Sequence, residues 1–322
     1  MADWQQLAFR VGLSLAGLAG HQRLSILIYH RVLPERDWMR PAEPTAEEFG
    51  WQMQLLSRHF NVLPLNEAVR RLHAGCLPPR AACVTFDDGY ADNATVALPV
   101  LQRYGLSATV FVASGYLNGG RMWNDTIVES LRVYDQPVLD LTEIDFPRYD
   151  TSSQEQRRKA AYAIIREGKY LPTGRRDEIA SCVAARVGPL PDHLMLTSSQ
   201  LRTLHHNGVE IGGHTVSHPI LTKLTLEQAR EQIQSGKAQL EALLDAPLRV
   251  FAYPNGRREK DYSDEHVSLV REAGFEVAVA TNWGVSSSAT DVLQLPRFTP
   301  WDTSAPKYLL RMALNMRQTA ES

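Results

Sequence analysis

The sequence predicts an α/β fold, a distorted (β/α) barrel of about seven or eight strands with a helical insertion. Two observations support this prediction. Short, continuous apolar runs alternate with amphipathic helical patterns, which is typical of buried parallel strands joined by helices. In addition, neither a GxGxxG sequence nor a P-loop follows any of these runs. The nucleotide-binding turn of the competing open, doubly wound sheet is therefore missing.

The apolar runs are interpreted as the barrel strands. Each has the length of a strand and no helical periodicity. In chain order they are Leu24–Tyr29, a weaker run Phe60–Leu63, Ala82–Phe86, Ala108–Ala113, Val209–Gly213, Leu248–Tyr253, Phe275–Ala280 and Val292–Leu295.

Helical patterns separate these runs and carry their own start and stop signals. Thr45-x-x-Glu48 and Thr225-x-x-Gln228 are capping boxes, which mark helix starts. Gly105 and Gly274 follow helical patterns and are expected to end them. The predicted helices begin near residues 46, 66, 96, 226 and 266.

The rhythm of strands and helices breaks between about residues 115 and 200. Three helical patterns follow one another there without a convincing strand, at Met122–Tyr134, Gln154–Gly168 and Arg175–Val187. We interpret this segment as a helical insertion in a barrel loop. The expected organisation is an N-terminal helical segment over 1–23, the barrel over 24–303, and a C-terminal helix over 304–322.

The composition predicts a globular protein that does not bind nucleic acid. Of 322 residues, 44% are hydrophobic and 22% are charged, and the formal net charge is −2. Nucleic-acid binding usually needs a clustered basic face, and the arginine pairs at 157–158, 175–176 and 257–258 are interpreted as solvated surface. Three irregularly spaced cysteines suggest neither a disulfide framework nor a CxxC metal site.

The apolar stretch Val11–Gly20 does not decide the cellular location of the protein. It is too short to span a bilayer, and it lacks the basic region and cleavage site of a clear signal peptide. A cytoplasmic location is therefore slightly favoured, with a periplasmic or membrane-associated one as the alternative. The oligomeric state is not indicated.

Two polar clusters follow predicted strands, where the catalytic groups of a barrel gather. Asp87 and Asp88 come directly after Ala82–Phe86, and His214 and His218 follow Val209–Gly213. A spacing of four places two imidazoles on one face of a helical turn, where they can bind one metal. The combined set offers three metal ligands and a spare carboxylate, as a catalytic metal site requires.

The resemblance to a known family rests on two motifs and on their order along the chain. Thr85–Gly89 and then His214–His218 resemble the first two motifs of NodB-type polysaccharide deacetylases, carbohydrate esterase family four. The resemblance implies that Asp88, His214 and His218 bind the metal and that Asp87 is the catalytic base. It covers roughly residues 24–114 and 205–300.

The third family motif is altered in this chain. Phe251–Gly256 resembles it, but Ala252 stands where the family has Arg and Asn255 where it has an aromatic residue. The Asn255 N–H is still expected to serve an oxyanion hole. Arg297, after the last predicted strand, is expected to replace the lost Arg that orients the base.

The fourth family motif lies out of order. The resemblance implies a histidine general acid on the last strand, but no His follows Arg297. The first predicted strand ends at His30, and the first and last strands of a closed barrel are neighbours. We therefore expect His30 to be the general acid, a permuted arrangement similar to that of some exopolysaccharide deacetylases.

Together these motifs predict a metal-dependent hydrolase that removes acetyl groups from acetylhexosamine units of a glycan. The nitrogen and oxygen ligands favour Zn²⁺, although Co²⁺, Ni²⁺ or Mn²⁺ fit the same set. The alternatives are an O-acetyl esterase, a small-amide deacylase, and an inactive glycan-binding barrel.

Overall fold

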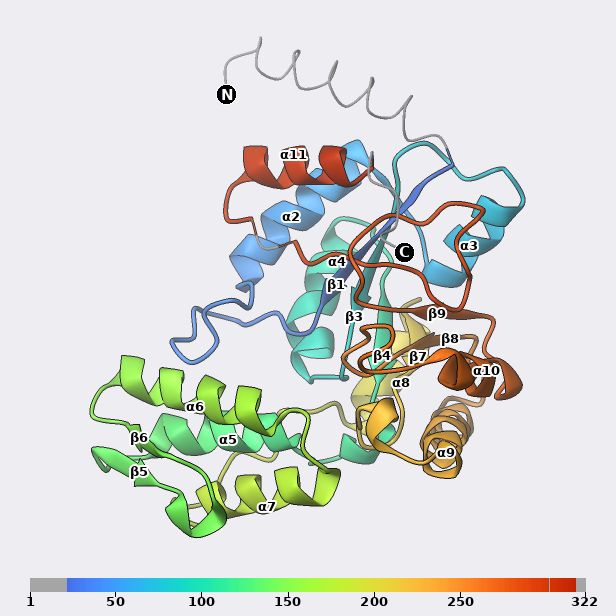
Figure 1. Ribbon diagram of the computed structural model, residues 1–322. Helices are drawn as coiled ribbons and strands as arrows, with labels where there is room; N and C mark the ends of the chain where they lie inside the picture. Colours follow the sequence, from blue (N-terminus) through green and yellow to red (C-terminus); the bar gives the residue numbers. More distant parts are fainter. Residues whose placement is uncertain (1–21, 301, 317–322) are drawn as a thin grey trace.

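A computed structural model describes residues 22–300 and 302–316, and it confirms the predicted barrel class (Figure 1). Within these residues the main sheet has seven strands, all paired in parallel, with β2 beside β3 and the rest in the order β1-β3-β4-β7-β8-β9. They are β1 (Leu24–Tyr29), β2 (Asn61–Val62), β3 (Ala81–Phe86), β4 (Thr109–Val112), β7 (Glu210–Gly213), β8 (Val250–Ala252) and β9 (Val277–Val279).

An irregular segment closes the sheet where an eighth strand was expected. The prediction of a strand over Val292–Leu295 was wrong, since that segment forms turns. Between residues 292 and 298, Leu295 forms a single bridge to β9 and Phe298 forms a single bridge to β1. Pro296 lies between them, and it cannot donate a ladder hydrogen bond because proline has no N–H. The first and last elements of the barrel are nevertheless neighbours.

Alternate strand residues fill the interior of the barrel. One buried cluster contains inward-facing residues of several strands, including Ile26, Cys83, Val250 and Val279. A second cluster lies outside the sheet, beneath the surrounding helices. These helices are α2 (Ala46–His59), α4 (Leu98–Arg103) with a preceding π-helical turn, α8 (Ser198–His206), α9 (Leu226–Leu244), α10 (Asp264–Glu272) and α11 (Ala305–Asn315). The capping boxes of α2 and α9 are present as predicted.

Helix α3 (Leu65–His73) packs against the interior cluster at the amino ends of the strands. Its N-cap position is Pro64, which supplies no side-chain cap. Instead, the Glu210 carboxylate at the start of β7 accepts the N–H groups of Leu65 and Asn66 and the hydroxyl of Thr109. A residue 145 positions away in sequence therefore caps this helix.

The segment between β4 and α8 forms a separate layer beside the barrel (Figure 1). Its helices α5 (Trp123–Val133), α6 (Gln154–Gly168) and α7 (Thr173–Ala184) surround an apolar cluster of their own. The expectation that it holds no strand was wrong, because β5 (Val138–Asp140) and β6 (Arg148–Asp150) form an antiparallel pair. Two strands of three residues leave little periodicity to detect. We call residues 123–184 the insertion.

The expected N-terminal segment cannot be compared in full, because residues 1–21, including Val11–Gly20, lie outside the described residues. The same holds for residues 317–322 at the end of the expected C-terminal helix. None of the helices within the described ranges is long and apolar enough to span a membrane.

Replacing Glu210 by Ala is expected to destabilise the fold by about 2 kcal/mol, because three buried donors lose their charged acceptor. Chemical denaturation measures this free energy of unfolding. The matched control is Glu231→Ala on the exposed face of α9, which should change it by less than about 0.5 kcal/mol. Equal stability of the two variants would show that Glu210 does not support α3.

Candidate metal centre and active site

Two adjacent carboxylates follow β3 at the carboxyl end of the barrel. Asp87 continues the inward-facing row of Cys83 and Thr85, whereas regular strand geometry would turn Asp88 to the opposite side. Asp88 and Gly89 instead have left-handed φ angles of 76° and 83°, so that both carboxylates line one cavity. A left-handed non-glycine residue is strained, and such strain gathers at functional sites.

Asp88, His214 and His218 are the one group of three potential metal ligands in residues 22–300 and 302–316. Asp88 Oδ1 lies 3.4 Å from His214 Nε2 and 3.5 Å from His218 Nε2. Within the part of the chain that the structure describes, the buried Asp88 Oδ1 and His214 Nε2 have no hydrogen-bond partner, which is uncommon for buried polar atoms. A divalent cation would satisfy both, so these residues fit the metal that the sequence predicts.

A backbone contact fixes the orientation of His214. Its Nδ1 lies 2.7 Å from the carbonyl oxygen of Ala252 in β8. Because a carbonyl can only accept, Nδ1 carries a proton, and Nε2 is the ring nitrogen that faces Asp88. Metal-binding histidines commonly have such a partner on the second ring nitrogen.

The two histidines meet in a loop, and the expected helical turn is absent. Thr215 and His218 have left-handed φ angles of 67° and 52°, which fold the loop back on itself. Gln232 of α9 accepts the N–H groups at 216 and 217 and so fixes the loop. Gly236 lets α9 approach, since a Cβ there would lie 2.9 Å from the Thr215 backbone.

Arg297 binds both oxygens of Asp87, with N–O distances of 2.7 Å. Both side chains are buried, and Arg297 also donates to the carbonyl of Ala280 and the hydroxyl of Thr85. Burial opposes ionisation of Asp87, but Arg297 outweighs it and lowers the pKa of this carboxyl. Asp87 is therefore an ionised carboxylate with a fixed orientation.

Asn255 and His30 lie at the same end of the barrel. Asn255 follows β8 with a φ of 60°, and its carbonyl accepts the hydroxyl of Thr281. Within the described chain its N–H has no hydrogen-bond partner, so the group is available to a ligand. His30 is an exposed side chain directly after β1.

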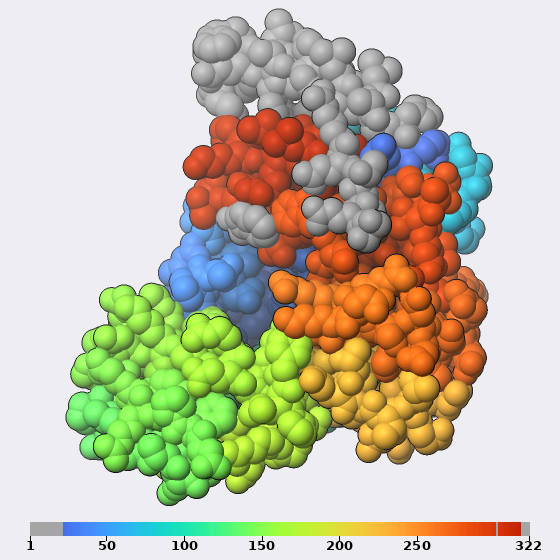
Figure 2. Space-filling view, in the orientation of Figure 1, coloured from blue at the N-terminus to red at the C-terminus, as the bar shows by residue number. Residues whose placement is uncertain are grey.

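All seven predicted site residues line one cavity of about 500 Å³. Loop and insertion residues complete its wall, and sequence reasoning missed them: Arg31, Arg40, Tyr162, Lys169, Arg257 and Trp283. The interpretation of all three arginine pairs as solvated surface was wrong for Arg176, which is buried. Arg257 is exposed as expected, although it also lines the cavity. No sequence signal joins these residues, because four separate segments meet there. In Figure 2 the green insertion and the orange barrel segments border a hollow.

The electrostatics suit a metal centre. Burial lowers the pKa of His218 to about 4, so its imidazole is neutral, as a metal ligand must be. Burial opposes the ionisation of Asp88, but His218 and His214 outweigh it and hold its pKa below the usual value. Burial also opposes the protonation of His214, but Asp88 and Asp87 outweigh it and raise the pKa of this imidazole. A metal bound at its Nε2 would therefore replace a proton.

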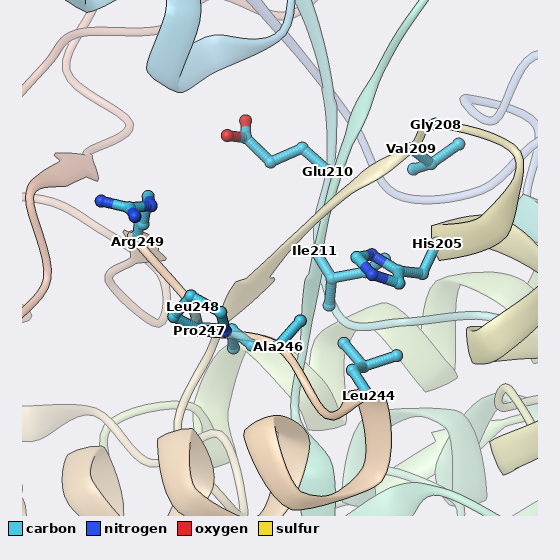
Figure 3. Close-up of a pocket in the computed structure, with 10 residues that line it drawn as sticks. All are labelled: His205, Gly208, Val209, Glu210, Ile211, Leu244, Ala246, Pro247, Leu248 and Arg249. Carbon is cyan, nitrogen blue, oxygen red and sulfur yellow. The ribbon is translucent and has the colours of Figure 1, made fainter.

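A second pocket, of about 240 Å³, lies at the opposite ends of the strands (Figure 3). His205 and Glu210 are on its wall, and Glu210 already caps α3. No group of three potential metal ligands within the described ranges lies here. The carboxyl-end cavity is therefore the candidate active site.

A known protein family matches much of the chain. The profile of the polysaccharide deacetylase family matches residues 74–278. The chain therefore belongs to this family and is a hydrolase of carbohydrate esterase family four. The matched range includes Asp87, Asp88, His214, His218 and Asn255, whereas His30 and Arg297 lie outside it.

Individual relatives are distant. YxkH of Bacillus subtilis (strain 168), whose name refers to the same family, is 21% identical over 276 residues, which are 85% of this chain and 70% of that protein. The structure of the Streptococcus pyogenes deacetylase PplD in complex with acetate has a TM-score of 0.61 at 20% identity, over 90% of this chain and 98% of the other. IcaB from Ammonifex degensii has a TM-score of 0.58 at 19% identity, over 92% and 97%. These structures establish a shared fold.

Asp88→Ala, His214→Ala and His218→Ala should each lose bound metal, because each removes one of three ligands. Elemental analysis of the purified variants measures the metal content. His193→Ala is the matched control, since its side chain is 82% exposed and lies outside the cavity. Full occupancy in all three ligand variants would refute the metal assignment.

Arg297→Met should destabilise the fold by about 3–5 kcal/mol, because it leaves Asp87 buried without its counter-charge. Adding Asp87→Asn should recover part of that loss, since the unpaired charge is then removed. Denaturation of the two single variants and the double variant measures the coupling. Strictly additive losses would show that the two side chains do not stabilise each other.

Proposed function

We propose that this polysaccharide deacetylase removes N-acetyl groups from acetylhexosamine units of a polysaccharide or glycan precursor and releases acetate. One observation carries the proposal: a three-ligand cluster and an ionised carboxylate bound by Arg297 share one cavity. Amide hydrolysis by a metal enzyme needs both a ligand set and a separate base.

Asp88, His214 and His218 would hold the metal, and their nitrogen and oxygen donors favour zinc, with cobalt, nickel or manganese as substitutes. When bound, a divalent ion acidifies water and polarises a carbonyl group. Asp87 is not part of this ligand group. Each of its oxygens accepts one hydrogen bond from Arg297 and keeps the capacity to accept a proton.

The remaining groups have separate tasks. Asp87 accepts the proton of the attacking water, and its pair with Arg297 keeps it ionised and oriented. The free N–H of Asn255 donates a hydrogen bond to the oxyanion that develops on the acetyl carbonyl. His30 donates a proton to the amine that leaves.

Asp87→Asn should keep the metal and lose turnover by about 10²–10⁴-fold, because a base is removed and a ligand is not. Asn has nearly the same shape as Asp, so its side-chain oxygen can still accept a hydrogen bond from Arg297. Acetate release and metal content are measured on the same preparation. Wild-type turnover in the variant would exclude Asp87 as the base.

His30→Ala should slow amide hydrolysis by about 10²–10⁴-fold, because the leaving amine needs a proton. Hydrolysis of an activated aryl acetate should fall much less, since a phenolate leaves without one. The comparison uses an N-acetylglucosamine oligosaccharide and an aryl acetate, with metal content as the control. Equal losses on both substrates, or a loss of metal, would reject the acid role.

A further inference from the structure

A cluster of three cations lies where the insertion meets the barrel. Lys169, at the end of α6, and Arg257, two residues after Asn255, both line the active-site cavity. Lys260 belongs to the same loop as Arg257, and its Nζ lies 4.4 Å from the centroid of the Tyr170 ring. Lys169 Nζ lies 5.7 Å from that ring. In Figure 2 the yellow-green end of the insertion meets the orange barrel segments. We call Lys169, Arg257 and Lys260 the cation cluster.

The cation cluster differs from the other cations of the cavity wall in lacking carboxylate partners. Three arginines of the wall are paired with carboxylates, in Arg31–Asp92 at 2.7 Å, Arg40–Asp125 at 2.6 Å and Arg297–Asp87 at 2.7 Å. Among residues 22–300 and 302–316, none of the three side chains of the cation cluster forms an ion pair within 4.0 Å.

One nearby carboxylate does not balance this charge. Asp261 is fully buried, and its Oδ2 accepts the backbone N–H of Arg257 at 3.0 Å. Burial lowers the pKa of Lys169, Asp261 opposes that effect, and Arg257 and Lys260 add to it. Like charges gathered at the mouth of a cavity attract an anion, because a bound anion relieves their mutual repulsion.

We propose that Lys169, Arg257 and Lys260 bind an anionic group of the glycan, a phosphate or a carboxylate, beside the acetamido sugar whose acetyl carbonyl is bound by the Asn255 N–H. The inference rests on the proposed function, since it places this anion on the deacetylated substrate. The Arg257 guanidinium offers a planar pair of donors to either anion, and the two lysines add point charges. Arg257 and Asn255 line the same cavity, so we expect the charge on the reacting sugar or on its neighbour.

The test compares acetate release by the metal-loaded enzyme from three matched N-acetylglucosamine oligosaccharides: neutral, phosphate-bearing and uronate-bearing. The measured quantity is the ratio of kcat/KM for each anionic substrate to kcat/KM for the neutral one. We expect a wild-type ratio of about ten for one of the anions. Lys169→Gln and Arg257→Gln should each lower it about fivefold, as expected for a partly exposed charge pair. Added salt should lower it as well.

Arg103→Gln is the control, because it removes the same charge from the exposed end of α4, at the opposite end of the strands. It should leave the ratio unchanged. The anion with the higher ratio identifies the ligand as phosphate or carboxylate. Ratios near one for both anions, with normal acetate release, would overturn this inference and leave the proposed function intact. Absence of acetate from all three substrates would overturn both.

Discussion

The buried ion pair between Arg297 and Asp87 is the interaction on which the site depends. It joins the segment that closes the barrel to the strand that carries the carboxylates. Arg297 holds Asp87 in one orientation, and it is the neighbouring Asp88 that lies with the two histidines. Two adjacent and chemically identical side chains thereby acquire different environments. A buried pair of this kind is costly to break, so closure of the barrel and formation of the site stabilise each other.

Strained backbone conformations bring the other site residues into the cavity. Asp88, Thr215, His218 and Asn255 all have left-handed φ angles, and each such residue costs roughly 1–3 kcal/mol. The strands and helices around these residues offset this cost in free energy. The strands are held by an interior and an exterior apolar cluster, and α9 anchors the histidine loop through Gln232. The stable part of the fold therefore holds the reactive part in a conformation that it would not adopt alone.

Sequence reasoning succeeded where the signal is local. Buried strands such as Leu24–Tyr29 are continuous apolar runs, and helix starts carry capping boxes, so both could be read directly. The pairing of Arg297 with Asp87 was also foreseen, from the family resemblance, because Ala252 stands where the family has the Arg that orients the base. The left-handed loop that joins His214 to His218 was not foreseen, since spacing alone favours a helical turn. The cation cluster was missed because distant segments meet there.

The central claim is that the metal lies between Asp88, His214 and His218 while Asp87 stays outside its coordination sphere. Anomalous diffraction at the zinc absorption edge, from crystals of the active zinc-loaded enzyme, tests it most directly. The account predicts one peak in the cavity, within about 2.0–2.2 Å of Nε2 of His214, a ring nitrogen of His218 and an oxygen of Asp88, with Asp87 still bound to Arg297. A zinc ion coordinated by Asp87, or no peak in crystals that release acetate, would contradict it.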